Sequence, residues 1–313
     1  MGVLSALQDA VVSLGARGIG RMSSDFRDRV ARQMATHWLS GDARYARTLH
    51  GNLRLAFPER NEQALRDLAE LNARRTARAQ IDHFWAWHAS PEVLRETVSL
   101  QGHAQLKDGM PTVLAGAHQL GFEVALIRMS MEVSGALVFD PGATPLPRAA
   151  QRAWSRFQPQ QVIAAEGALR PARAAVRSGK PLLLLADEPA EGQHAEVAPL
   201  LGTTMRFTPL VSFLARACAA RVVWLDVRQS DSGNYRATLS EPFAASEMAE
   251  PAASAQAMAA RLERALRVDP AGYWWGRKTV GGVRPVRAEQ IGTKGGAMGA
   301  DQSQGSGSVR AGG

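Results

Sequence analysis

The spacing of apolar residues changes character near residue 100 of this chain. Before that point, apolar positions recur every three or four residues, which is the period of an amphipathic helix. The pattern is clearest in ARQMATHWL, EQALRDLAELNARRTARAQIDHFWAWH and SPEVLRETV. In the last of these, Ser90 and Pro91 are residue types that favour a helix N-cap and a first helical position. We therefore expect residues 1–98 to form an N-terminal helical region.

Beyond residue 111, short apolar runs alternate with helical stretches. Alternation of this kind predicts an α/β fold with a mostly parallel sheet flanked by helices. We expect this core to span residues 99–285. The segment 286–313 is rich in glycine and serine and has no periodicity, so we expect a disordered tail there. The predicted strands are TVLAGA, GALVFD, QVIAAE, PLLLLA, RVVWLDV and YRATLSEPF.

The apolar stretches are too short to cross a membrane. None reaches the roughly 18 to 20 uninterrupted apolar residues that a spanning helix needs. Residues 3–20 predict an amphipathic helix instead. Such a helix can lie on a membrane surface or pack on the body of the protein, and both alternatives stay open. Its modest apolar face is formed by Val3, Leu7, Ala10, Val11 and Leu14.

Composition and charge narrow the classes of function. The chain has 313 residues, of which 45% are hydrophobic, so it can bury a large core. Its single cysteine, Cys218, excludes an internal disulfide and a cysteine zinc cluster, and fits a reducing compartment. The formal net charge of +8 comes mostly from arginine and favours an anionic partner. Nucleic acid, anionic lipid headgroups and an acidic carrier protein all qualify.

The common catalytic and cofactor-binding motifs do not occur in the sequence. There is no G-x-G-x-x-G after a strand, no G-x-x-x-x-G-K-[ST], no G-x-S-x-G and no H-E-x-x-H. We therefore do not expect a dinucleotide, a nucleotide, a serine nucleophile or a catalytic zinc ion. The sequence predicts neither a cofactor nor a metal site.

Two aromatic groups stand out. In HFWAWH, residues 83–88, the two histidines lie five positions apart on a predicted helix and point in different directions, which disfavours a shared metal. The tryptophans of this segment and the aromatic run 273–275 are expected to pack in the core. A belt at a membrane interface is the alternative.

The hexapeptide HQLGFE, residues 118–123, contains the candidate chemistry. It follows the run TVLAGA, so we expect His118 at the carboxyl end of a strand, where ligands bind in open α/β sheets. Glu123 then falls in the first turn of the next helix. Within one helix the five-residue spacing would turn the side chains ~140° apart, whereas a strand end and a first turn let them meet.

A carboxylate that accepts a proton from one imidazole nitrogen leaves the other nitrogen able to take a proton from a hydroxyl. Because the motif has no serine, that hydroxyl would belong to a substrate or to water, giving base-catalysed acyl transfer or hydrolysis. The alternative is a structural histidine, with Glu123 favourable only to the helix dipole. The six residues alone do not decide between the two.

Several further segments follow one another in a specific order. The order along the chain is NLRLAFPE (52–59), HQLGFE, PLLLLADEP, VAPLLG, FTPLVSFLARACAARVV and DPAGYWWGRK (269–278). Together they resemble the bacterial lipid A biosynthesis acyltransferases, the late lauroyl/myristoyl-type enzymes of the lysophospholipid acyltransferase superfamily. The resemblance covers about residues 45–280. It depends most on NLRLAFPE upstream of H-x-x-x-x-E and on the terminal P-x-x-Y-x-W.

The resemblance implies a glycerol-phosphate-acyltransferase-like fold and transfer of a fatty acyl chain from acyl-ACP or acyl-CoA to a lipid or glycolipid hydroxyl. His118 matches the family's catalytic base, and Glu123 matches the acidic member of its H-x-x-x-x-[DE] dyad. Asp187, in LADEP, matches an acidic residue at a later strand end. Arg156 matches an arginine of the family's R-x-R-F-G pattern, with Arg152 as an alternative. We expect Asp187, Arg156 and Arg152 to bind substrate. The guanidinium groups of the two arginines suit a phosphate or phosphopantetheine.

The chain departs from the family pattern in ways that leave the acceptor lipid open. An amphipathic segment replaces the usual membrane-spanning helix, QLGF separates the dyad residues, and DE replaces DQ at 187–188. We expect a cytoplasmic protein, peripheral on the inner membrane, with an acyl carrier, a lipid and a membrane surface as partners and no nucleic acid. Two alternatives remain. One is a non-catalytic lipid- or carrier-binding relative, and the other is a basic nucleic-acid-binding protein, which no recognisable nucleic-acid module supports.

Overall fold

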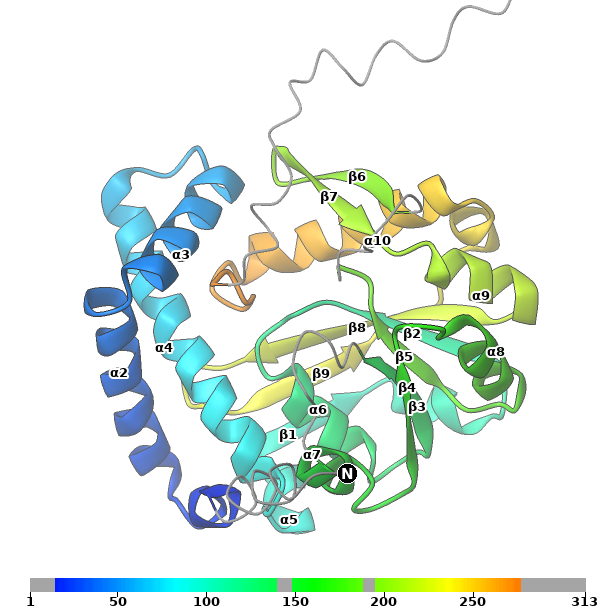
Figure 1. Cartoon of the computed structure of the whole chain (residues 1–313), viewed down its shortest axis with the longest axis horizontal. Helices are drawn as coiled ribbons and strands as arrows, with labels where there is room; N and C mark the ends of the chain where they lie inside the picture. The colour runs from blue at the N-terminus through cyan, green and yellow to red at the C-terminus, as the bar shows by residue number, and fades with distance from the viewer. Residues whose placement is uncertain (1–14, 140–147, 188–194, 277–313) are drawn as a thin grey trace, which may run out of the picture.

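The sheet at the centre of the fold is mixed, and most of its strands run parallel (Figure 1). The computed structural model describes residues 15–139, 148–187 and 195–276. In this part of the chain a seven-stranded sheet has the order β1-β9-β8-β2-β5-β3-β4, and its β8–β9 pair is antiparallel. The prediction of a mostly parallel sheet flanked by helices is confirmed. The strands are β1 (Val98–Gln101), β2 (Thr112–Gly116), β3 (Gly135–Phe139), β4 (Gln160–Ala164), β5 (Leu182–Leu185), β8 (Arg221–Gln229) and β9 (Tyr235–Leu239).

Helices cover both faces of this sheet. Strand β2 is buried along its whole length, and its successive side chains alternate between two hydrophobic clusters. Val113 and Ala115 pack with helices α8, α9 and α10, whereas Leu114 packs with α6 and α7. Burial on both faces is why residues 113–116 of the strand are all apolar. These helices are α6 (Phe122–Met129), α7 (Arg148–Trp154), α8 (Leu169–Arg177), α9 (Leu210–Cys218) and α10 (Pro251–Val268).

The sequence pattern does not predict three strands. Strand β1 has only four residues and follows directly on a helix. The other two, β6 (Glu196–Leu200) and β7 (Thr203–Phe207), form an antiparallel hairpin apart from the main sheet. The hairpin contains Pro199, which is tolerated because it lies at an edge where its missing N–H is not needed. Short edge strands of mixed polarity give a weak periodic signal.

The helices that precede the sheet each begin at a polar cap. The side chains of Ser23, Asp42, Asn61 and Ser90 accept hydrogen bonds from backbone N–H groups in the first turns of their helices. The predicted cap at Ser90, followed by Pro91, is confirmed. The helices are α2 (Ser24–Ser40), α3 (Ala43–Ala56), α4 (Glu62–Ala86) and α5 (Pro91–Thr97), and two 3₁₀ turns occur further on at His103–Lys107 and Ala245–Met248.

A buried cluster of charged groups joins this helical region to the sheet. Asp82 of α4 accepts hydrogen bonds from Arg27 of α2, from Arg78 Nε at 2.9 Å and 3.0 Å, and from the Tyr235 hydroxyl of β9 at 2.8 Å. The Arg27 guanidinium also lies 4.0 Å from the centre of the Trp85 ring. One carboxylate therefore connects two helices and strand β9 of the sheet.

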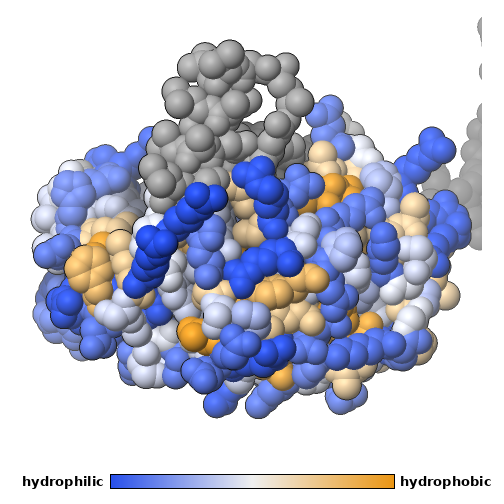
Figure 2. Space-filling view, turned by 90° about the horizontal axis from the view of Figure 1, so that it is seen from below, coloured by the Kyte–Doolittle hydropathy of each residue, from blue (hydrophilic) through white to orange (hydrophobic). Residues whose placement is uncertain are grey.

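Hydrophilic side chains are prominent on one face of the molecule (Figure 2). On the face at the bottom of Figure 1, long hydrophilic side chains project between smaller apolar groups (Figure 2). No helix within the described ranges is long and apolar enough to cross a membrane. The expected tail 286–313 and residues 3–14 of the expected amphipathic segment lie outside those ranges. The large apolar side chains that are exposed come from separate elements: Phe26, Leu55, Val93, Met110, Leu169, Val197 and Val268.

Candidate active site

His118 lies just beyond the carboxyl end of β2, at the position that the sequence predicts. A tight turn follows it, and Gly121 there has a φ of 85° immediately before α6. A Cβ atom at residue 121 would lie 2.2 Å from the Tyr235 ring, so both the backbone conformation and the close approach require glycine. Glu123 falls in the first turn of α6, as expected.

The Asp187 carboxylate is in contact with the His118 ring. Strand β5 pairs in parallel with β2, so the residues that follow the two strands meet at one edge of the sheet. The Nδ1 atom of His118 lies 3.0 Å from Asp187 Oδ1 and 3.1 Å from Oδ2. The backbone N–H of His118 also donates to Oδ2, at 3.0 Å. The imidazole is 12% exposed, whereas the carboxylate is fully buried.

The surroundings of Asp187 keep it charged. Burial by itself would raise the pKa of this carboxyl group, but the adjacent His118 and the hydrogen bonds from His118 and Tyr273 outweigh it. The resulting pKa of Asp187 is lower than its ordinary value. A charged carboxylate accepts hydrogen bonds only, so the proton between the two groups belongs to Nδ1. In the neutral ring the Nε2 atom then carries the lone pair that a general base needs.

A segment near residue 273 completes the surroundings of His118. The Tyr273 hydroxyl donates to Asp187 Oδ2 at 2.6 Å. The residues on either side of Tyr273 form hydrogen bonds with the backbone of residues 118–120. Leu120 N–H donates to the Gly272 carbonyl at 2.8 Å, and Trp274 N–H donates to the His118 carbonyl at 3.0 Å. The hexapeptide HQLGFE and the distant P-x-x-Y-x-W segment are thus in direct contact.

Two buried asparagines from the helical region hold this segment. Asn72 of α4 donates through Nδ2 to the carbonyls of Ala271, at 2.9 Å, and Tyr273, at 2.7 Å. Asn52 of α3 donates through Nδ2 to the Trp275 carbonyl at 2.7 Å. Since Asn52 opens NLRLAFPE, two of the segments that support the family resemblance bind each other.

Sequence reasoning did not assign these residues to the site, although signals for them exist. Tyr273 and Asn52 each lie in a segment that the resemblance singles out. Asn72 falls on the buried stripe of α4, between Leu68 and Thr76, where an apolar residue is the rule. A polar residue at such a position needs a hydrogen-bond partner, and this requirement marks it.

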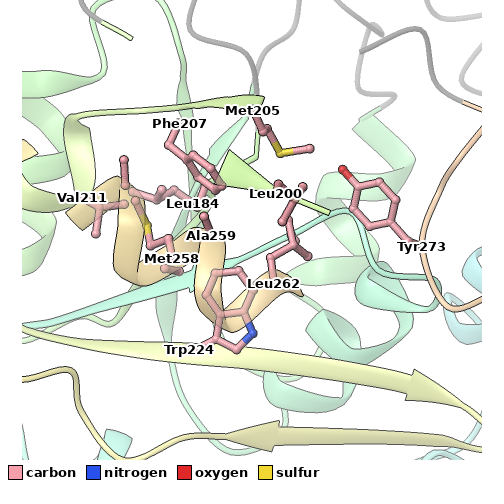
Figure 3. Close-up of a cluster of buried hydrophobic side chains, with 14 of the residues drawn as sticks. Leu184, Leu200, Met205, Phe207, Val211, Trp224, Met258, Ala259, Leu262 and Tyr273 are labelled. Atoms are coloured by element: carbon pink, nitrogen blue, oxygen red, sulfur yellow. The ribbon is translucent and has the colours of Figure 1, made fainter. Parts of the chain in front are cut away.

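The hydroxyl of Tyr273 reaches the carboxylate from an apolar surrounding. Its ring lies at one end of a cluster of buried side chains from the sheet, the hairpin and α10, beside Leu200 and Met205 (Figure 3). The ring is 3% exposed and packs edge-on against Trp275, with 4.9 Å between ring centroids. Little water reaches the contact between the Tyr273 hydroxyl and Asp187.

The remaining predicted site residues are Glu123, Arg152 and Arg156. Glu123 is partly buried, and its charge opposes the lowering of the His83 pKa that burial causes. Its expected role beside His118 stays a prediction. In the described part of the chain, no group of three or more potential ligands could hold a metal ion.

The two arginines expected to bind substrate differ in their surroundings. Arg156 donates to the carbonyls of Trp87, at 2.7 Å, Ala86, at 3.3 Å, and Ala89, which lie at the carboxyl end of α4. Burial lowers its pKa. Arg152 is exposed on α7. For both residues, as for Asp187, binding of substrate stays a prediction, and the contacts of Arg156 are those of a helix C-terminal cap.

Comparisons with known proteins match nearly the whole chain to one family. Residues 3–279 match the sequence model of the bacterial lipid A biosynthesis acyltransferases. The lipid A biosynthesis lauroyltransferase of Escherichia coli (strain K12) is 22% identical over 238 residues, which cover 74% of this chain and 78% of that protein. The crystal structure of the 1-acyl-sn-glycerophosphate (LPA) acyltransferase PlsC from Thermotoga maritima aligns with 78% of this chain and 98% of that chain, at 13% identity and a TM-score of 0.38. The family match includes every residue that contacts His118, Asp187 or Tyr273 above.

Proposed function

This chain belongs to the bacterial lipid A biosynthesis acyltransferase family and is an acyltransferase, and we propose that it moves a fatty acyl chain from a carrier thioester to a hydroxyl of a lipid or glycolipid. The donor is acyl-ACP or acyl-CoA, and His118 is the general base. The observation that supports this role is the pairing of His118 Nδ1 with the buried Asp187 carboxylate at the carboxyl edge of the sheet.

The proposed reaction uses this geometry in two steps. His118 Nε2 takes the proton of the acceptor hydroxyl while the hydroxyl oxygen attacks the thioester carbonyl carbon. The tetrahedral intermediate then collapses, the C–S bond breaks, and the proton on His118 passes to the leaving sulfur. An ester and a free thiol result. Asp187 stabilises the imidazolium between these steps, because its negative charge lies 3.0 Å from the Nδ1 atom.

The first acceptor to test is a lipid A precursor, since the Escherichia coli relative is named for lipid A biosynthesis. A carrier thioester in water and a lipid acceptor can meet only at a membrane surface. The proposal therefore places the protein peripherally on the cytoplasmic face of the inner membrane. A net charge of +8 supports contact with anionic lipid headgroups and with an acidic carrier.

The test is acyl transfer by purified protein with and without the imidazole. Labelled acyl-ACP and acyl-CoA are supplied in parallel, together with a lipid A precursor or a total lipid extract. His118→Ala should lower the rate by about 10²- to 10⁴-fold, the usual contribution of a general base. His37→Ala, which removes an exposed histidine of α2, should leave the rate unchanged. Equal labelling by wild type and His118→Ala, with both proteins folded, would refute the proposal.

A further inference from the structure

We propose that Tyr273 is a positioning residue of the acyl-transfer site: its hydroxyl holds Asp187 against His118, and Asn52 and Asn72 hold the backbone on which Tyr273 lies. The inference rests on the proposed function, because it concerns the same base. It assigns a role to the C-terminal segment 271–275 and links the N-terminal helices to the rate of the reaction.

The orientation of the Asp187 carboxylate depends on the groups that donate to it. Asp187 can orient His118 only if its own side chain is fixed, since a carboxylate after a strand end is otherwise able to rotate. Its Oδ2 atom accepts from the Tyr273 hydroxyl at 2.6 Å and from the His118 backbone N–H at 3.0 Å. Both carboxylate oxygens remain within 3.1 Å of His118 Nδ1. The two donors on Oδ2 therefore set the angle at which the carboxylate faces the ring.

The environment of the hydroxyl strengthens this contact. The Tyr273 ring is held by the buried cluster of Figure 3 and by Trp275, so the hydroxyl has a fixed origin. A hydrogen bond from a neutral hydroxyl to a charged carboxylate is short and strong, and exclusion of water strengthens it further. Of the described residues, His118 and Tyr273 are those that lower the pKa of Asp187.

Hydrogen bonds from the helical region also fix the backbone of residues 271–275. Asn72 binds two of its carbonyls and Asn52 binds a third, and both amides are buried. Within the segment, the Trp275 indole N–H donates to the Pro270 carbonyl at 2.6 Å. A continuous path of hydrogen bonds therefore runs from α4 through Tyr273 and Asp187 to the base.

The direct test is Tyr273→Phe, which removes one oxygen and keeps the ring. We expect kcat to fall on the order of 10-fold, the effect of losing one charge-assisted hydrogen bond, while KM changes little. The acid limb of the kcat–pH profile should move to higher pH. The reason is that a carboxylate with one donor fewer holds the protonated imidazole more strongly.

A matched control is available in Tyr235→Phe. Tyr235 is also buried and also donates to a buried aspartate, Asp82, at 2.8 Å. The control should lower stability and leave the acid limb where it is in the wild type. If the acid limb of the kcat–pH profile shifts equally in Tyr273→Phe and Tyr235→Phe, the proposal is overturned. Such a result would show a general effect of losing a buried hydroxyl.

A second readout needs no substrate. The imidazole resonances of His118, identified by their loss in His118→Ala, are followed by NMR as a function of pH. We expect the midpoint of this titration to rise in Tyr273→Phe and to stay constant in Tyr235→Phe. If the midpoint rises but the wild type transfers no acyl chain, the positioning role stands and the proposed function fails. If the wild type is active and neither midpoint nor limb moves in Tyr273→Phe, the positioning role is overturned and the proposed function stands.

The part played by Asn72 is tested by a double-mutant cycle. If Asn72 acts through Tyr273, then Asn72→Ala combined with Tyr273→Phe should reduce kcat by less than the product of the two single effects. Full additivity of the two effects in folded proteins would overturn the assignment for Asn72. Circular dichroism spectra of all four proteins establish that each is folded.

Discussion

The buried carboxylate of Asp82 leads to a large and specific stability prediction. In Asp82→Ala, the guanidinium groups of Arg27 and Arg78 lose their common acceptor while each side chain is only 5% exposed. Removing one partner of a buried ion pair costs about 3–5 kcal/mol, because the remaining charge is left without compensation. Some compensation persists here. Arg78 keeps the Ser24 hydroxyl at 2.9 Å, and Arg27 keeps the Trp85 ring at 4.0 Å. We therefore expect a loss of about 4 kcal/mol in the free energy of unfolding.

This loss is measured by urea denaturation, monitored by tryptophan fluorescence and by far-UV circular dichroism. Arg267→Ala is the control, since Arg267 is 57% exposed and pairs with Glu263, which is 30% exposed, at a distance from the cluster in the sequence. An exposed pair of this kind contributes about 1 kcal/mol or less. If Asp82→Ala lowers the free energy of unfolding no more than Arg267→Ala does, the cluster does not attach the helical region to the sheet, and the prediction is refuted.

Two further predictions concern carboxylates. Asp187→Asn should lower kcat on the order of 10²- to 10⁴-fold, because an amide cannot stabilise the imidazolium of His118, whereas Glu123→Gln should cost less than about 10-fold. Acyl-transfer kinetics of the two variants decide the order, and the reverse order would show that Glu123 orients the base. Hydrogen bonds from Lys107 and Arg128 lower the pKa of Glu132 from 4.5 to about 2 against the opposing effect of burial. Because the pKa is lowered on folding, ionised Glu132 stabilises the fold fully above pH 4.5 and loses this effect as the pH falls towards 2. Glu132→Gln should therefore lower the free energy of unfolding by about 1–2 kcal/mol at pH 7, and in urea titrations the difference from the wild type should vanish towards pH 2. A difference that stays constant with pH would contradict this prediction.

The sequence predicts elements better than it predicts their neighbours. The continuous apolar run 112–117 identifies β2 because that strand is buried on both faces, and the polar residues after it place His118 at its end. The sheet order is a different matter. Strand β5 is the third strand after β2 along the chain but its immediate neighbour in the sheet. No local pattern encodes that adjacency, so Asp187 is expected at a strand end without being recognised as the partner of His118.

The same limitation applies to the C-terminal aromatic run. Core packing is expected there, and the burial of Tyr273 and Trp275 confirms it. The contact between the Tyr273 hydroxyl and Asp187 cannot be read from the sequence, because it depends on where residues 86 positions apart meet. Arg156 shows the converse. Its place in a family pattern favours substrate binding, yet its contacts with the end of α4 appear only in three dimensions.

The hydrogen bonds from Asn52 to Trp275 and from Asn72 to Tyr273 join residues 223 and 201 positions apart. Contacts of such long sequence separation are slow to form, because closing a long loop costs entropy. During synthesis, helices α3 and α4 leave the ribosome well before the segment that they bind. His118 and Asp187 emerge earlier than Tyr273 as well, and until residue 273 arrives their carboxylate lacks one of its donors. The nascent enzyme is therefore expected to gain full activity only when the segment 271–275 docks between its own first helices and its sheet.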